Sequence, residues 1–82
     1  MKYIVDITVQ LKDGMRDPEA STLQRSLEQI GFKTHKLTLA KKFHVTIDAE
    51  SEDAAEEQGR AMCERLLANP VIHNYTITVV RK

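Results

Sequence analysis

Cysteine, tryptophan and an excess of positive charge are missing or scarce in this chain of 82 residues. A single cysteine, Cys63, excludes both an internal disulfide and a metal site built from paired cysteines. Lysine and arginine number 12, as do aspartate and glutamate, so the formal net charge is zero. Proteins that bind nucleic acid or an anionic membrane need a basic excess, so the sequence disfavours both kinds of partner.

Long apolar runs and glycine-rich loops are missing as well. The N-terminal residues alternate apolar and polar types, unlike a secretory signal, and no run approaches membrane-spanning length. Gly14, Gly31 and Gly59 stand apart, so no phosphate-binding loop is present. We therefore expect one cytoplasmic domain spanning residues 1–82, in which 41% hydrophobic residues form a single modest core.

Apolar and polar residues alternate in four parts of the chain, as they do along strands with one buried face. The alternation is clear over residues 3–11, 43–49 and 75–79, and it is weaker at Leu37 and Leu39. Residues 40–42, "AKK", are expected to turn the chain between the second and third strands without help from glycine or proline.

A first helix is expected to begin at Asp17 and Pro18, because aspartate caps exposed amides and proline fits the first helical position. It should end at Gly31, which readily adopts the left-handed conformation that terminates helices. Between them, apolar residues recur at helical spacing and should face the sheet: Ala20, Leu23, Leu27 and Ile30.

A second helix is expected to begin after Ser51, whose hydroxyl can cap it. Its apolar stripe is predicted from helical spacing: Ala55, Gly59, Met62 and Leu66. Close packing on a strand would compensate for a glycine within a helix. Asn69 tolerates the left-handed conformation and Pro70 cannot continue a helix, so the helix should end there.

The expected order of elements is therefore β-α-β-β-α-β. Right-handed crossovers place both helices on one face of the sheet. The predicted fold is α+β and ferredoxin-like, with a four-stranded antiparallel sheet and two helices on one face.

No side chain lies in a recognisable catalytic or metal-binding pattern. Cys63 is expected to be buried, since no histidine lies within one helical turn to act as its base. His35, His44 and His73 fall on three different elements without the spacing of metal ligands. We therefore expect no catalytic, cofactor-binding or metal-binding residues in this chain.

The sheet face away from the helices is predicted to be polar, threonine-rich and to carry His44. RNA-binding domains of this topology carry stacking aromatic residues there, and this face has none. Two interpretations remain open: the face is solvated, or it packs against another copy of the sheet.

Two blocks of the sequence resemble the family of PurS subunits of phosphoribosylformylglycinamidine synthase. The first block is "LKDGMRDPEA", with Lys12, Gly14, Met15, Asp17 and Pro18 at the matching positions. The second is "MCERLLANPVIHNYTI", with Cys63, Leu66, Leu67, Asn69, Pro70, Val71, Ile72 and Tyr75. The similarity covers essentially the whole chain. It departs at Ala40-Lys41, where the family usually has Gly-Lys, which leaves the form of the hairpin turn open.

The resemblance implies a small non-catalytic subunit of an ATP- and glutamine-dependent ligase of purine biosynthesis. Such subunits form dimers or tetramers, bridge a PurQ-type glutaminase and a PurL-type synthetase, and assist the passage of ammonia between them. The resemblance also implies that the synthetase subunit, and not this chain, uses ATP and magnesium.

Contacts with the partner enzymes are expected at loops and helix ends. The candidate interface residues form two segments: Met15, Arg16, Asp17 and Pro18, and Asn69, Pro70, Ile72 and His73. Two alternatives share the expected fold: an amino-acid-sensing domain of ACT type, and a small acylphosphatase-like enzyme. Arg16 lies roughly where the acylphosphatase has its anion-binding arginine, but the glycine-rich cradle is missing.

Overall fold

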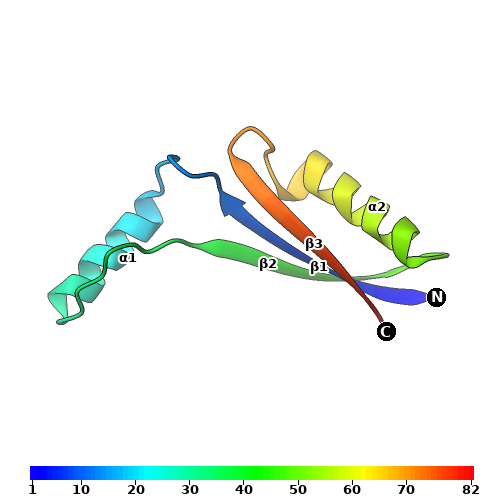
Figure 1. Ribbon diagram of the computed structural model, residues 1–82, viewed down its shortest axis with the longest axis horizontal. Helices are drawn as coiled ribbons and strands as arrows, with labels where there is room; N and C mark the ends of the chain where they lie inside the picture. The colour runs from blue at the N-terminus through cyan, green and yellow to red at the C-terminus, as the bar shows by residue number, and fades with distance from the viewer.

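The computed structural model describes residues 1–82 and contains three strands and two α-helices (Figure 1). The elements follow in the order β1 (Lys2–Leu11), α1 (Pro18–Gln29), β2 (Ala40–Asp48), α2 (Glu52–Met62), the π-helical turn η1 (Cys63–Leu67) and β3 (His73–Arg81). We call β1, β2, β3, α2 and η1 the body of the molecule, and residues 18–39, which contain α1, the arm.

The sheet of the body is antiparallel, with β1 in the centre between β2 and β3. Val5 of β1 lies opposite Val45 of β2 and Val79 of β3. The predicted alternation along β1 is confirmed, because its helix-facing residues are all buried: Tyr3, Val5, Ile7 and Val9. These residues and the inner face of α2 form the core.

The prediction of a four-stranded sheet is wrong, because the sheet has three strands and residues 36–39 are in no strand. The predicted hairpin turn at residues 40–42 is wrong for the same reason. Ala40, Lys41 and Lys42 lie inside β2 and are paired with β1. A tight hairpin turn favours glycine or asparagine with positive φ, and "AKK" has neither. The chain therefore runs straight from the arm into β2.

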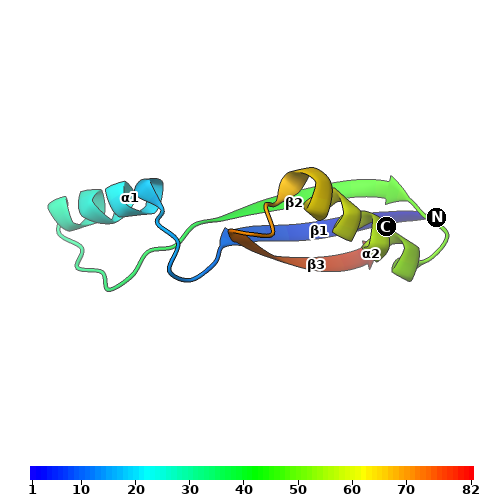
Figure 2. The same cartoon turned by 90° about the horizontal axis from the view of Figure 1, so that it is seen from above.

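Helix α2 packs across β1 and β3, as Figure 2 shows from above. Ser51 caps it by accepting a hydrogen bond of 3.1 Å from the Ala54 amide to its Oγ. Gly59 allows the close approach that was expected: a Cβ atom at this position would lie 2.7 Å from Val5 Cγ1. The absence of a side chain at Gly59 therefore sets the distance between helix and sheet.

Both ends of α1 form as predicted. Asp17 Oδ1 accepts hydrogen bonds from the amides of Glu19 and Ala20, at 3.1 and 3.2 Å. At the other end Gly31 has a φ of 105°, and the Phe32 amide donates to the Leu27 carbonyl at 2.9 Å. This 6→1 bond closes a Schellman motif.

The position of α1 differs from the prediction, because α1 does not cover the sheet. It projects away from the body, which gives the molecule a long axis of 51 Å and a short axis of 15 Å (Figures 1 and 2). Of its predicted inward stripe, only Ala20 is buried, whereas Leu23 and Ile30 are exposed. Local sequence forms the helix, but no surface of the same chain receives its apolar face.

The end of the second helix also differs from the prediction. The Ala68 amide donates to the Cys63 carbonyl at 3.0 Å, which is the i→i+5 bond of a π-turn. The wider turn shifts the later residues around the axis, so Cys63 and Ala68 are buried while Leu66 is 83% exposed. Asn69 does not adopt the left-handed conformation, since no residue other than glycine has positive φ.

Candidate docking site

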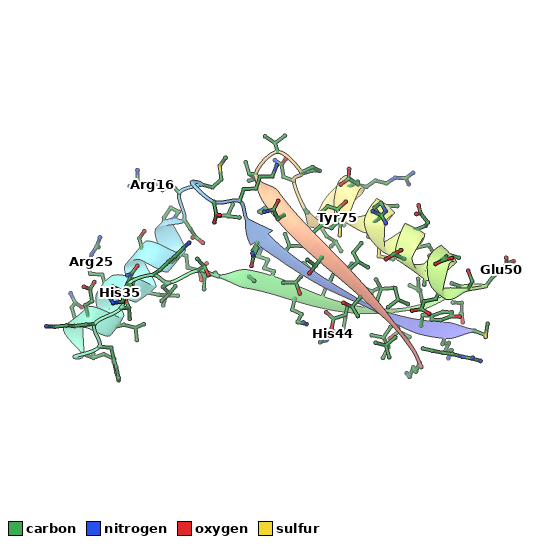
Figure 3. The ribbon with its side chains drawn as sticks, in the orientation of Figure 1. Arg16, Arg25, His35, His44, Glu50 and Tyr75 are labelled. Carbon is green, nitrogen blue, oxygen red and sulfur yellow. The ribbon has the colours of Figure 1, made fainter.

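The two predicted contact segments lie at the same end of the sheet, where β1 ends and β3 begins (Figure 1). The Lys12 amide donates to the Ile72 carbonyl at 2.9 Å and ties the connection after β1 to the one before β3. Figure 3 shows Arg16 on the first of these connections, at the root of the arm. The candidate residues on the two connections are thus brought to one end of the body.

The connection between η1 and β3 is held by four hydrogen bonds that involve Asn69 or His73, one of them from the Ile72 amide to the Asn69 carbonyl at 3.0 Å. The Asn69 amide donates to His73 Nδ1 at 2.9 Å, and the His73 amide donates to the Asn69 carbonyl at 2.7 Å. The Asn69 side chain in turn accepts from the Val71 amide at 3.0 Å. Pro70 further limits the backbone. Asn69 and His73 therefore order this loop, and Val71 at its tip is free to make contacts.

Large apolar side chains are exposed at this end of the body. Leu66 is 83% exposed, Val71 75% and Met15 45%. Exposed apolar groups of this size are typical of surfaces that bind another protein. We call Met15–Pro18, Asn69–His73 and Leu66 together the docking end. Leu66 was missed by sequence reasoning because a regular 3.6-residue period placed it in the core, and only the π-turn moves it out.

Asp17 and Pro18 have structural roles at the docking end, because they start α1. Next to them is a hollow of about 560 Å³ between the connection after β1 and residues 36–39. Its rim is polar and carries Lys12, Arg16 and Lys36, with Lys36 Nζ 4.0 Å from Asp13 Oδ1. Arg16 has no carboxylate partner and is available for a contact.

Cys63 is a buried core residue, as predicted. Burial, and to a lesser extent the neighbouring carboxylate of Glu64, raises the pKa of its thiol. The reactive thiolate is therefore disfavoured. On the surface nearby, the Tyr75 hydroxyl donates to Glu64 Oε2 at 2.8 Å, and this hydrogen bond is the main reason that the pKa of Tyr75 is raised. This pair joins η1 to β3.

The three histidines remain apart, as expected. His35 lies on the arm, and His44 lies on the open face of the sheet, which is the face away from α2 (Figure 3). His73 belongs to the docking end. His44 Nε2 is 3.4 Å from Asp6 Oδ2, and Lys42 Nζ is 3.3 Å from Asp6 Oδ1. No group of three or more histidine, cysteine or acidic residues has the arrangement of a metal site. No helix is long and apolar enough to span a membrane.

Fold and surface together define a small α+β protein with large apolar side chains exposed at one end of its sheet. Residues 4–81 match the family model PurS, described as phosphoribosylformylglycinamidine (FGAM) synthase. The chain belongs to the PurS family. This membership favours the synthase interpretation over the amino-acid sensor and the acylphosphatase-like enzyme.

Several PurS subunits are similar to this chain over nearly its whole length, in sequence and in structure. The chain is 43% identical over 75 residues to the PurS subunit of FGAM synthase from Archaeoglobus fulgidus, covering 90% of this chain and 94% of the relative. It is 38% identical over 79 residues to the subunit from Methanothermobacter thermautotrophicus, with 96% and 94% covered. Its fold is similar to that of a chain in the structure of PurLQS from Thermotoga maritima, with a TM-score of 0.87 and 34% sequence identity. The similarity covers 98% of this chain and 99% of that chain.

Proposed function

We propose that this chain is the small adaptor subunit of FGAM synthase, the ATP- and glutamine-dependent ligase of purine biosynthesis. In this role it bridges the glutaminase and synthetase subunits and assists the transfer of ammonia. The match to the PurS family over residues 4–81 carries the proposal. The likeness to a chain of the Thermotoga maritima PurLQS structure supports the bridging role.

A physical need explains why such a ligase uses a third subunit. Ammonia released into water is protonated and diluted, and the protonated form is not a nucleophile. A junction that keeps the glutaminase and synthetase sites in fixed register conserves the free base. An adaptor needs no nucleophile of its own for this task, only a rigid body and contact surfaces, which agrees with a buried Cys63 and with an ordered docking end.

On this proposal the docking end contacts a partner enzyme. Met15 and Arg16 supply an apolar and a cationic contact on one connection, and Val71 and Leu66 supply apolar contacts from the other side. Asn69, Pro70 and His73 hold the second connection in shape, and Ile72 anchors it to Lys12. Asp17 and Pro18 fix the start of α1 and thereby the position of Met15 and Arg16.

The remaining chemistry of the reaction is assigned to the partners. We place ATP and magnesium on the PurL-type synthetase subunit and glutamine hydrolysis on the PurQ-type glutaminase, with no cofactor on this chain. The complex operates in the cytoplasm, and this chain takes part in it as a homo-oligomer.

The test of the docking end is assembly of the three subunits, measured by sedimentation velocity. Replacing Met15 and Arg16 together by glutamate removes an apolar and a cationic contact, so we expect at least a tenfold weaker complex with unchanged circular dichroism. A control outside the docking end is Thr78→Glu, which places a glutamate at an exposed position on the face of the sheet away from α2. Equal complex formation by the double variant and the wild type would remove Met15 and Arg16 from the interface.

A further inference from the structure

The loop between η1 and β3 depends on a histidine nitrogen that carries no proton. The Asn69 amide donates a hydrogen bond of 2.9 Å to His73 Nδ1. A ring nitrogen can accept a hydrogen bond only when it is unprotonated, so His73 is the neutral tautomer with its proton on Nε2. The His73 amide in turn donates to the Asn69 carbonyl at 2.7 Å, so the two residues are joined twice. The loop in this form therefore requires a neutral His73.

The Asn69 amide depends on His73 for its hydrogen bond. The preceding amide, that of Ala68, closes the π-turn by donating to the Cys63 carbonyl at 3.0 Å. The Asn69 amide has no backbone acceptor and donates to His73 Nδ1 alone. Protonation of Nδ1 would place a second N–H group against the Asn69 N–H group. Because two donors cannot bond to each other, protonation breaks this contact between the loop and β3.

A hollow beside His73 gives the protonated ring a different environment. This hollow of about 390 Å³ lies between the end of β1, the beginning of β2 and the start of α1. Asp17 and Glu19 line it together with His73, and Lys41 is the cationic residue in its wall. Two carboxylates and one ammonium group favour an added positive charge. The neutral ring is therefore held by Asn69, and the imidazolium is drawn toward the start of α1.

The other elements beside His73 offer no comparable partner for a positive charge. Leu11 of β1, which lies opposite His73 in the sheet, is neutral. The charged residues of η1 are Glu64 and Arg65. Glu64 Oε2 already accepts a hydrogen bond of 2.8 Å from the Tyr75 hydroxyl. The two carboxylates of the hollow are therefore the acceptors available to a protonated His73.

We propose that His73 is a pH-sensitive switch of the docking end. Neutral His73 holds the loop in the form that presents Val71, and protonated His73 releases it. The released loop binds the partner enzyme more weakly, so acid weakens assembly. This inference rests on the proposed function, because it concerns regulation of the same docking surface.

The direction of the pH dependence follows from the number of bound protons. Histidine is the side chain that gains a proton within the range of about pH 5 to pH 8. The held loop binds one proton fewer than the released loop, so the held form gains stability as pH rises and loses it as pH falls. Assembly should therefore be strongest at neutral and mildly alkaline pH and weaken on acidification.

The first experiment uses the chain alone, so its result is independent of the ligase subunits. Nitrogen NMR of the histidine rings identifies which ring nitrogen carries the proton at each pH. We expect the proton of His73 on Nε2 at neutral pH, and we expect the Asn69 amide signal to shift as the His73 ring is protonated. A proton on Nδ1 at neutral pH, or an Asn69 signal that does not follow the titration of His73, would overturn the proposal.

The second experiment measures assembly with the partner subunits by sedimentation velocity. The wild type should bind about tenfold more weakly at about pH 5.5 than at about pH 7.5, through the loss of one hydrogen bond. His73→Asn retains an acceptor in place of Nδ1 but cannot gain a proton in this range, so its binding should depend less on pH. His44→Asn is the matched control, because His44 lies on the open face (Figure 3), and it should lose affinity as the wild type does. Equal pH dependence of the wild type and His73→Asn would refute the switch.

A third variant removes the acceptor at every pH. His73→Leu cannot accept from the Asn69 amide, so it should bind the partner subunits about tenfold more weakly than the wild type at about pH 7.5, with little further loss in acid. Binding as strong as that of the wild type at this pH would contradict the role of the hydrogen bond. Failure of the wild type to assemble even at this pH would instead refute the proposed function, while the NMR titration still decides whether His73 controls the loop.

Discussion

The body and the arm each contain a capped amphipathic helix, yet only the helix of the body is covered by its own sheet. Helix α2 buries Ala55 and Gly59 against β1 and β3, and α1 leaves Leu23 and Ile30 exposed. The comparison separates two requirements. Capping residues and apolar spacing are sufficient to define a helix, whereas its place in the fold depends on the connections that lead to it.

The largest difference between the body and the arm is expected when an isoleucine in each of them is replaced by alanine. Ile7 is fully buried in the body, so Ile7→Ala should lower the free energy of unfolding by about 3 kcal/mol through lost burial and a cavity. Ile30→Ala should cost less than about 0.5 kcal/mol, because its side chain is exposed in the single chain. Urea titration at a concentration where the chain is monomeric measures both. Equal losses would show that α1 packs on the body.

A second substitution probes how closely each helix approaches its surroundings. Gly59→Val should cost about 2 kcal/mol, since the new Cβ would lie 2.7 Å from the side chain of Val5 in the core. Ser26→Val on the exposed surface of α1 should cost only about 0.3 kcal/mol, from helix propensity. Thermal unfolding of both variants makes the comparison. A Gly59→Val protein as stable as the wild type would contradict the close packing of α2.

The residues that cap the two helices, Ser51 at α2 and Asp17 at α1, should differ in how their loss affects the body. The expected effects are smaller than those of the core substitutions. Ser51→Ala should lower the free energy of unfolding of the body by about 1 kcal/mol. Asp17→Ala should instead reduce the helix signal at 222 nm without shifting the urea midpoint of the body, because α1 does not pack on the sheet. A shift of that midpoint in Asp17→Ala would indicate that the arm and the body unfold together.

The smallest expected effect lies in the body and depends on pH. The hydrogen bond from Tyr75 to Glu64 raises the pKa of Tyr75, so the protonated phenol stabilises the folded state. This contribution is complete below pH of about 10, the pKa of an unfolded tyrosine, and is lost as pH rises through the higher folded value. The urea midpoint should therefore fall between pH 9 and pH 11.5 by more in the wild type than in Tyr75→Phe. If the urea midpoint falls by the same amount in both proteins, the hydrogen bond between Tyr75 and Glu64 does not contribute to stability.

Much of the body could be predicted from sequence because its signals are local. The alternation of Tyr3, Val5, Ile7 and Val9 gives β1, and Ser51 and Gly59 mark the start of α2 and its close approach to the sheet. Asp17 and Gly31 likewise mark both ends of α1. In each case the residue type determines the local backbone or its burial, whatever the rest of the fold does.

The predictions of a second strand at Leu37 and Leu39 and of a buried Leu66 are wrong, because local sequence patterns do not determine these features. Leu37 and Leu39 have the alternation of a strand, but a strand also requires a partner, and residues 40–42 do not turn to provide one. Leu66 has the spacing of a core residue, but a single π-turn rotates it to the surface. The docking segments were proposed from helix ends and from family resemblance, and their proximity became visible only through the Lys12–Ile72 hydrogen bond.

The most direct measurement of the central claim compares the two nitrogen sources of the reconstituted ligase. The matching synthetase and glutaminase subunits are assayed for product with glutamine and, separately, with ammonia, each with and without this chain. An adaptor that couples the two sites should be required for the glutamine-dependent reaction and dispensable for the ammonia-dependent one. If the glutamine-dependent rate is the same without this chain, the proposed role as a bridge for ammonia transfer is wrong.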